Sequence, residues 1–288
     1  MPERVIVDSD ALVVGPTFTG TDEEAAATTG VPTVTVTSRA LGTTLTAPTA
    51  SAGTGTGVYT VPLTTSAHTG SIDVLDLVWT GTVSGKTRVL SQSVEVVGGF
   101  YESIPNLRSI TTLSSAATRP AAQLRRFRNE LEDICEMARG TAFVHRCAIE
   151  THTTGPVRLK HRHVVSLLAV TIDGVAKTAA DYTADPITRT LTTTDGSAVY
   201  FTDSVRVAYV HGYQSPPGAL VEACREYVRA KATIDSSNAN RNPTSVTELA
   251  TGTVYRFGTA DPKYGRWTGI EGVDERINQV DDERVLVR

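Results

Sequence analysis

Apolar and polar positions alternate in short runs over the first part of the chain, to about residue 98. The apolar members of each run fall on one face: Val34 and Val36; Leu75, Leu77 and Trp79; Leu90, Val94 and Val96. A period of two is typical of strands with one buried face. Turns rich in Gly, Pro and Thr separate the runs at short intervals. The pattern predicts a small β-sandwich over residues 1–98.

A helical period replaces this alternation after residue 118. Apolar residues recur every three or four positions and form one stripe: Leu124, Phe127, Leu131, Ile134 and Ala138. Gly140 is a typical stop signal. The charged residues of the run are expected to form a solvated or interfacial face: Arg125, Arg126, Arg128, Glu132, Asp133 and Glu136.

Strand patterns return over residues 142–211, with an Asp173-Gly174 hairpin signal. A second helix then starts after a turn that contains Pro216 and Pro217. Its stripe contains Leu220, Val221, Cys224, Tyr227 and Val228. The order helix, strands, helix predicts an α+β domain over residues 119–234, with helices packed on a small antiparallel sheet and a linker over 99–118.

The remaining residues, 235–288, are polar and glycine-rich, with isolated large apolar residues. The run "GVDERINQV" is compatible with one short helix. The apolar residues are too far apart to form a core of their own, so we expect a loop and an extended tail that becomes ordered on a partner.

Composition narrows the functional classes. The formal net charge of −4 does not indicate a protein that binds nucleic acid through bulk charge. Three widely spaced cysteines, Cys135, Cys147 and Cys224, suggest unpaired thiols and offer no paired zinc ligands. No apolar run is long enough to span a membrane, and no signal peptide is visible.

Candidate chemistry is sparse. His161 and His163 would share a face if they lay on a strand, but no third metal ligand is evident. A general base at His211 would need a partner that the sequence does not identify. The stretch around His161 and His163 also carries a short basic patch, made of Arg158, Lys160 and Arg162. This patch could contact phosphates as part of a DNA-channel surface, or it could be a solvent-exposed or subunit-contacting face. No catalytic, metal-binding or cofactor-binding motif is found, so neither an enzyme nor a cofactor is predicted.

The order of the segments resembles one family. "AAQLRRFRNELEDICEMARGTAFVHR", "HVVSLLAVTIDG" and "VRVAYVHGYQSPPGALVEACREYVRAKA" are similar to head-to-tail adaptor (connector) proteins of long-tailed bacteriophages. "VYRFGTADPKYGRWTGIEGVDERINQV" resembles the C-terminal segment of actinobacteriophage members, and the first 98 residues resemble their extra immunoglobulin-like β-sandwich domain. Each motif is weakly specific, and the order over nearly the whole chain carries the resemblance.

The resemblance implies a structural protein of the virion neck, assembled in the host cytoplasm. It implies a homo-oligomeric ring of twelve copies between the portal protein and a stopper or tail-completion protein. Genomic DNA would pass through the ring without sequence-specific contacts, and no membrane would be involved. The tail would then supply a portal or subunit interface through spaced apolar residues: Tyr255, Phe257, Tyr264, Trp267, Ile277 and Val285.

Two alternatives belong to other classes. A β-sandwich with exposed Tyr and Trp would suit a carbohydrate- or surface-binding tail module. The second alternative is a small hydrolase or a metal-dependent enzyme, in which the histidines would be the catalytic groups. A large ring is required only by the neck protein.

Overall fold

In a computed structural model of the chain, the structure describes residues 3–20, 22–153, 156–186, 188–197, 199, 204–236, 245–248, 253–256, 263 and 265–280. The chain divides into two compact units, each made of two segments. We call Met1–Gly99 with His145–Gly212 the β unit, and Phe100–Val144 with Tyr213–Arg288 the helical unit. The predicted α+β class with a sandwich-like N-terminal region is confirmed. The predicted domain boundaries stay predictions, because compactness does not measure independent folding.

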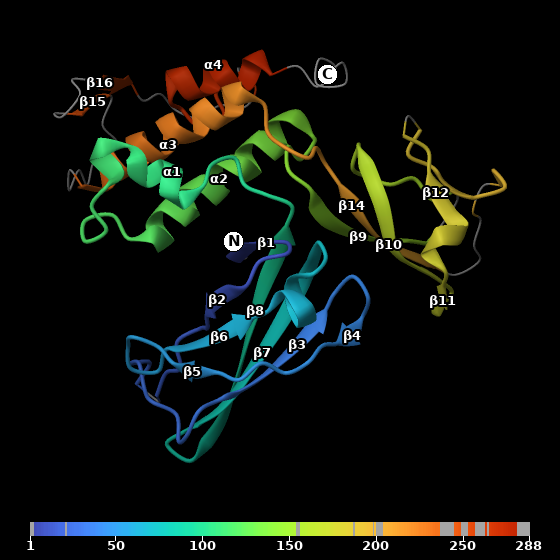
Figure 1. Cartoon of the computed structure of the whole chain (residues 1–288), viewed down its shortest axis with the longest axis horizontal. Helices are drawn as coiled ribbons and strands as arrows, with labels where there is room; N and C mark the ends of the chain where they lie inside the picture. Colours follow the sequence, from blue (N-terminus) through green and yellow to red (C-terminus); the bar gives the residue numbers. More distant parts are fainter. Residues whose placement is uncertain are drawn as a thin grey trace. The chain divides into compact units, whose positions relative to one another are not determined.

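Two sheets form the sandwich within the β unit (Figure 1). One has the order β1-β8-β7-β3-β4, with β1 (Glu3–Ile6), β8 (Lys86–Val97), β7 (Asp73–Val83), β3 (Thr33–Ser38) and β4 (Thr43–Thr44). The other has the order β2-β6-β5, with β2 (Ala11–Val14), β6 (Tyr59–Leu63) and β5 (Ser51–Ala52). A π-helical turn, Thr65–Thr69, follows β6. The alternation predicted from the sequence is confirmed, because one cluster buries residues of both sheets: Val34, Val36, Leu75, Leu77, Trp79, Val94 and Val96 with Val13, Val61 and Leu63.

A further sheet in the β unit has the order β11-β10-β14-β9. Its strands are β9 (Arg146–His152), β10 (Val164–Ile172), β11 (Val175–Lys177) and β14 (Val205–His211). A short helical turn, Ala179–Asp181, leads into the hairpin of β12 (Tyr182–Ala184) and β13 (Leu191–Thr193). The predicted turn between β10 and β11 is confirmed: Asp173 and Gly174 have φ of 49° and 77°, the left-handed conformations that a tight hairpin requires.

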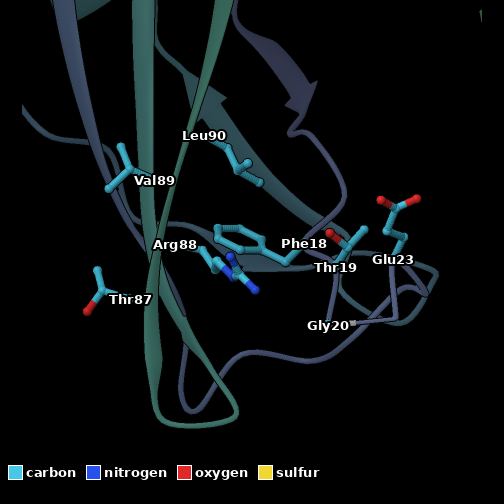
Figure 2. A pocket seen from close by; sticks show the side chains of 8 residues that line it. All are labelled: Phe18, Thr19, Gly20, Glu23, Thr87, Arg88, Val89 and Leu90. Carbon is cyan, nitrogen blue, oxygen red and sulfur yellow. The ribbon is translucent and has the colours of Figure 1, made fainter.

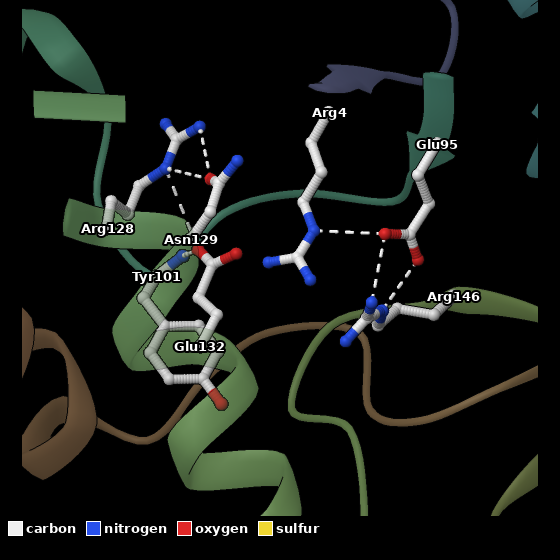
Figure 3. A network of polar contacts seen from close by, with 7 residues as sticks. All are labelled: Arg4, Glu95, Tyr101, Arg128, Asn129, Glu132 and Arg146. Carbon is white, nitrogen blue, oxygen red and sulfur yellow. Dashed lines mark hydrogen bonds and ion pairs between the residues drawn. The ribbon is translucent and has the colours of Figure 1, made fainter. Parts of the chain in front are cut away.

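A buried carboxylate joins the two segments of the β unit. Glu95, on β8, is 4% exposed and accepts hydrogen bonds from Arg4 on β1 (3.0 Å) and from Arg146 on β9 (2.6 and 2.9 Å) (Figure 3). Burial alone would raise the pKa of Glu95, but the hydrogen bond and charge of Arg146, together with Arg4, outweigh it and lower the pKa. Next to this contact, the N–H of Gly98 donates to the carbonyl of His145 (2.9 Å). A Cβ at Gly98 would lie 2.7 Å from that of His145, so the close approach requires glycine.

The helical unit buries the predicted stripes of its two long helices. Its helices are α1 (Ile104–Ser109), α2 (Ala121–Arg139), α3 (Gly218–Ser236) and α4 (Glu271–Gln279), and β15 (Ser245–Glu248) pairs with β16 (Thr253–Arg256). Gly140 ends α2 at φ 67°, as the sequence predicts. The segment expected to be a linker differs from that expectation, because α1 and the 3-10 turn Thr111–Leu113 bury Leu107 and Leu113 in the common core.

The charged face expected on α2 is partly wrong. Arg128 and Glu132 are 2% and 3% exposed, so they belong to the interior. The Arg128 guanidinium lies over the ring of Phe100, 3.3 Å from its centroid, and donates to the carbonyl of Glu102 (3.2 Å). Glu132 accepts from the backbone N–H of Tyr101 (2.8 Å) (Figure 3). Both charges became buried because the chain entering the helical unit supplies polar backbone partners.

Among the described residues, no helix combines the length and the apolar character that crossing a membrane requires.

We predict that Glu95→Gln destabilises the full chain by about 3–5 kcal/mol at neutral pH, because the buried guanidinium of Arg4 and the largely buried guanidinium of Arg146 lose the carboxylate that they pair with. Chemical denaturation measures the free energy of unfolding. The folded-state pKa of Glu95 is lowered, so wild type has this stabilisation above the ordinary glutamate pKa and loses it as the pH falls through the folded-state value. The difference between variant and wild type should therefore shrink in acid.

The matched control for this prediction is Asp76→Asn. Asp76 of β7 pairs with Arg39, which directly follows β3, but the two side chains are far more exposed than Glu95, at 39% and 46%. We expect a loss below about 1 kcal/mol. Equal losses of stability for the two variants would show that burial does not distinguish the two pairs.

The predicted burial of Cys135 and Cys224 as unpaired thiols is confirmed. Burial raises the pKa of Cys135 to about 12 and that of Cys224 well above its ordinary value. In a Cys147→Ser background we therefore expect maleimide labelling at neutral pH to be slow until denaturant is added, because the thiolate is the reactive form. Adding Met137→Cys, at a position of α2 that is 66% exposed, gives a control thiol that should react at once. Fast native labelling without that control thiol would contradict the packing of α2 and α3.

Candidate functional site

The basic segment lies between β9 and β10 of the β unit. Val157 and Leu159 are buried in the core of this sheet, whereas Arg158, Lys160 and Arg162 are exposed. The segment is not a continuous strand, because residues 160–163 form bends. The three cations nevertheless reach solvent, because the apolar residues between them anchor the segment. Their role at a DNA or subunit surface stays a prediction.

Hydrogen bonds hold the backbone of this segment in place. The N–H of Leu159 donates to the carbonyl of Arg189 (2.9 Å), and the Arg158 Nε donates to the carbonyl of Thr188 (3.1 Å). The Arg189 side chain in turn donates to the carbonyl of Lys160 (2.8 Å). A cation on a fixed backbone loses less conformational freedom on binding an anion than one on a mobile loop.

Glu150 and Tyr209 support the segment from the sheet beneath. The N–H of Lys160 donates to both carboxylate oxygens of Glu150, at 3.0 and 3.1 Å. The Tyr209 hydroxyl also donates to Glu150 and accepts from the N–H of His161 (3.2 Å). Burial and the Glu150 hydrogen bond both raise the pKa of Tyr209, so the hydroxyl stays protonated as a donor. Sequence reasoning missed this pair, because the two residues are far apart along the chain and no motif links them.

The histidines do not form the arrangement that the sequence suggested. His163 has φ 54° and lies in the bend, so His161 and His163 do not share a strand face. The ring of His161 stacks on that of His211, with centroids 4.0 Å apart. His211 is 2% exposed, and burial, followed by the charges of His161 and Arg146, lowers its pKa to about 2. A histidine that is buried and neutral over the physiological range is poorly suited to act as a general base.

Gly212 follows His211 and ends the β unit. Its φ of 100° suits only glycine, and its N–H donates to the carbonyl of His163 (3.0 Å). In the helical unit, Tyr213 stacks on Phe143 with ring centroids 5.7 Å apart. Helix α3 then begins at Gly218, directly after Pro217. The turn therefore has a structural role, because it leads the chain from the end of β14 to the start of α3.

Most of the predicted C-terminal interface residues cannot be placed. Phe257, Tyr264 and Val285 lie outside the described residues, and for Tyr255 the structure describes only the backbone, opposite Val246 in the β15–β16 pair. The two others lie at the end of the helical unit. Trp267 is half-buried and donates from Nε1 to Asn278 (3.0 Å), and Ile277 is fully buried.

The expectation that this segment lacks a core differs from the structure over α4. Val273 and Ile277 pack into the core of the helical unit, and the two flanking residues Ile270 and Val280 join them. A Cβ at Gly272 would lie 2.4 Å from a carboxylate oxygen of Glu226, so α4 approaches α3 closely. The apolar residues of α4 are thus buried against α3, which supplies the packing surface that the sequence of the segment does not show.

Polar contacts fix both ends of α4. The buried carboxylate of Asp274 accepts from the N–H groups of Thr268 (2.7 Å) and Gly269 (3.1 Å). At the other end, Arg139 of α2 donates to the carbonyl of Ile277, which places a cation at the negative end of the helix dipole. Ile277 thus connects the segment to its own unit.

The aromatic residues of the sandwich are buried, which corrects the premise of the carbohydrate-binding alternative. Trp79 and Phe18 are fully buried, and Tyr59 is 7% exposed. The hydroxyl of Tyr59 accepts from the N–H of Thr28 (3.0 Å). A sugar-stacking platform needs an exposed ring face, and none of these three residues offers one.

Comparisons with known proteins add little. No protein-family model matches the chain. No curated protein matches it. Among solved structures, a chain from the neck of an empty GTA particle computed with C6 symmetry is similar, with a TM-score of 0.41 and 15% identity. The match covers 63% of this chain and 91% of that chain. A likeness at this level leaves the function to be argued from the chain's own residues.

We predict that replacing Arg158, Lys160 and Arg162 by Gln weakens binding to short duplex DNA by a similar factor for every sequence. The slope of log K against log salt should fall by about 0.9 for each phosphate that the variant no longer neutralises. Fluorescence anisotropy over a salt series measures both quantities. The charge-matched control replaces three exposed cations elsewhere, Lys86, Arg125 and Lys177, by Gln. An equal weakening of binding in the two variants would mean that bulk charge, and not this segment, attracts the DNA.

Proposed function

We propose that the chain is a structural protein of a virion neck, a head-to-tail adaptor that forms a ring between the portal and a stopper or tail-completion protein. The observation that carries the proposal is the order of elements: α2, the sheet of β9, β10 and β14, a glycine-proline turn, α3 and the terminal helix α4. This order follows the segments in which the sequence resembles phage adaptors. The ring would contain about twelve copies if the resemblance holds for stoichiometry as well.

The exposed basic segment supports a passive role toward DNA. Its three cations are held on a braced backbone, and the formal net charge of the chain is −4. A few phosphate contacts with no base-reading element give weak, salt-dependent and sequence-independent attraction. Such attraction suits a channel lining, because tight binding would stop the DNA from moving.

The C-terminal segment would supply the portal or subunit interface. In this proposal α4 anchors the segment through Ile277, and Trp267, Tyr255, Phe257, Tyr264 and Val285 contact the partner. Large aromatic residues contribute much of the binding energy when they become buried at an interface. The protein would act in the virion at the head-tail junction, without catalysis, cofactor or membrane.

Two observations count against the alternatives. The sandwich buries its aromatic rings, and His211 is buried with a strongly lowered pKa.

We predict that the purified full chain assembles into closed rings with a central channel, seen by native mass spectrometry and negative-stain electron microscopy. A variant that ends at Val280 keeps α4 and should unfold at the same temperature as wild type, because it removes no described core residue. We expect it to assemble less well, since it lacks Val285 and the residues around it. A full chain that stays monomeric at all concentrations and salts tested would contradict the ring, and unchanged assembly of the shortened chain would contradict the role of its last residues.

A further inference from the structure

Strand β8 is paired on one side over almost its whole length and on the other side over only a third of it. β7 pairs with β8 from Lys86 to Val96, whereas β1 pairs only with residues Val94–Val97. Over residues 86–93, no described strand lies on the outer side of β8. In an antiparallel pair, alternate residues direct both N–H and C=O away from the partner strand. This stretch therefore presents a row of backbone donors and acceptors to its outer side.

A groove of about 560 Å³ runs along this edge (Figure 2). Thr87, Arg88, Val89 and Leu90 form one wall. Residues Phe18, Thr19, Gly20 and Glu23 form the other. Figure 2 shows the side chains of Arg88 and Leu90 directed toward the Phe18 loop, and those of Thr87 and Val89 on the opposite side of the strand. The side chains therefore alternate as in a regular strand: Arg88 and Leu90 lie on the face toward the groove, and Thr87 and Val89 lie on the opposite face.

Two features make this edge suited to a ligand. The Arg88 Nε is buried and has no hydrogen-bond partner among the described residues. Gly81 is the residue opposite Arg88 on β7, and the Phe18 ring and the Thr28 side chain fill the space where its side chain would lie. On the outer face, Val89 is 61% exposed and offers an apolar contact next to Arg88. A buried guanidinium donor without a partner is costly, and an incoming acceptor would remove that cost.

We propose that this groove binds an extended peptide segment of a partner protein, which adds to β8 as a further strand and places a carboxylate side chain at Arg88. Backbone hydrogen bonds to residues 87–92 would supply affinity, as in other cases of strand addition. Side chains at alternate positions would supply specificity.

The two faces of the edge define the class of peptide. The acidic residue faces Arg88, and the residue two positions away faces Leu90 and the Phe18 ring, which favours an apolar side chain. The residue between them lies beside Val89 and favours a β-branched side chain. Glu23, on the opposite wall, disfavours a second carboxylate there. The partner segment therefore alternates an acidic, a β-branched and an apolar residue. This site lies in the sandwich and does not depend on ring formation.

The test uses the full chain and a synthetic peptide, acetyl-Thr-Ile-Glu-Val-Val-Thr-amide, with a second peptide that carries Lys in place of Glu. We expect the Glu peptide to bind wild type by isothermal titration calorimetry and to slow amide hydrogen exchange over residues 87–92. Arg88→Glu should weaken binding of the Glu peptide by about tenfold or more, because a charge-assisted hydrogen bond is replaced by repulsion. The Lys peptide should prefer this variant over wild type.

The matched control is Lys177→Glu, the same charge reversal on the edge strand β11, which should leave both affinities unchanged. Failure of the Glu peptide to bind wild type, or to protect residues 87–92, would overturn the proposal. Binding that is insensitive to Arg88→Glu would also overturn it. Protection of residues 87–92 that rises with protein concentration in the absence of peptide would show that a second copy of the chain is the occupant, which would equally overturn it.

Discussion

The β unit depends on one buried carboxylate. Glu95 belongs to the sandwich, and the guanidinium groups that neutralise it come from the first strand of the chain and from a strand that begins about fifty residues later. A carboxylate can be buried only if its charge is compensated and its oxygens accept hydrogen bonds, and here three donors meet those requirements. The side chain of Arg146 is 17% exposed, so the additional positive charge reaches water. This ion cluster brings the start of β9 to the end of β8.

Periodicity predicted these elements well because β3, β7 and α2 each bury a single face. The faces containing Leu75, Leu77 and Trp79, and the stripe of α2, could be identified without any knowledge of their partners. The local sequence does not show which elements these faces pack against. Arg128 and Glu132 look like surface residues in the sequence, and their burial depends on backbone groups of residues 101–102. For the same reason the sequence does not reveal the core of α4, whose apolar face packs against residues of α3 that lie far away along the chain.

In the candidate site, too, some features could be predicted from the sequence and others depend on the fold. The exposure of Arg158, Lys160 and Arg162 follows from alternation with Val157 and Leu159, which a sequence displays. The carboxylate and hydroxyl beneath them, Glu150 and Tyr209, come from two other strands and could not be paired in advance. The lone edge of β8 was also hidden, since it results from β1 pairing with only four residues of a twelve-residue strand. Contacts between neighbouring strands, and strand edges without a neighbour, can be identified only when the pairing of the strands is known.

The arrangement of both units as two separated chain segments affects folding during synthesis. The polypeptide leaves the β unit after Gly99, returns at His145 and leaves it again after Gly212. The apolar stripe of α2 is therefore complete at Arg139, while its partners on α3 and α4 are synthesised later. At typical elongation rates, roughly 7–28 s pass between the addition of Arg139 and that of Val280. Until α3 and α4 are added, the stripe of α2 can pack only against the earlier residues of this core, such as Leu107 and Leu113, so part of its apolar surface stays exposed on the nascent chain.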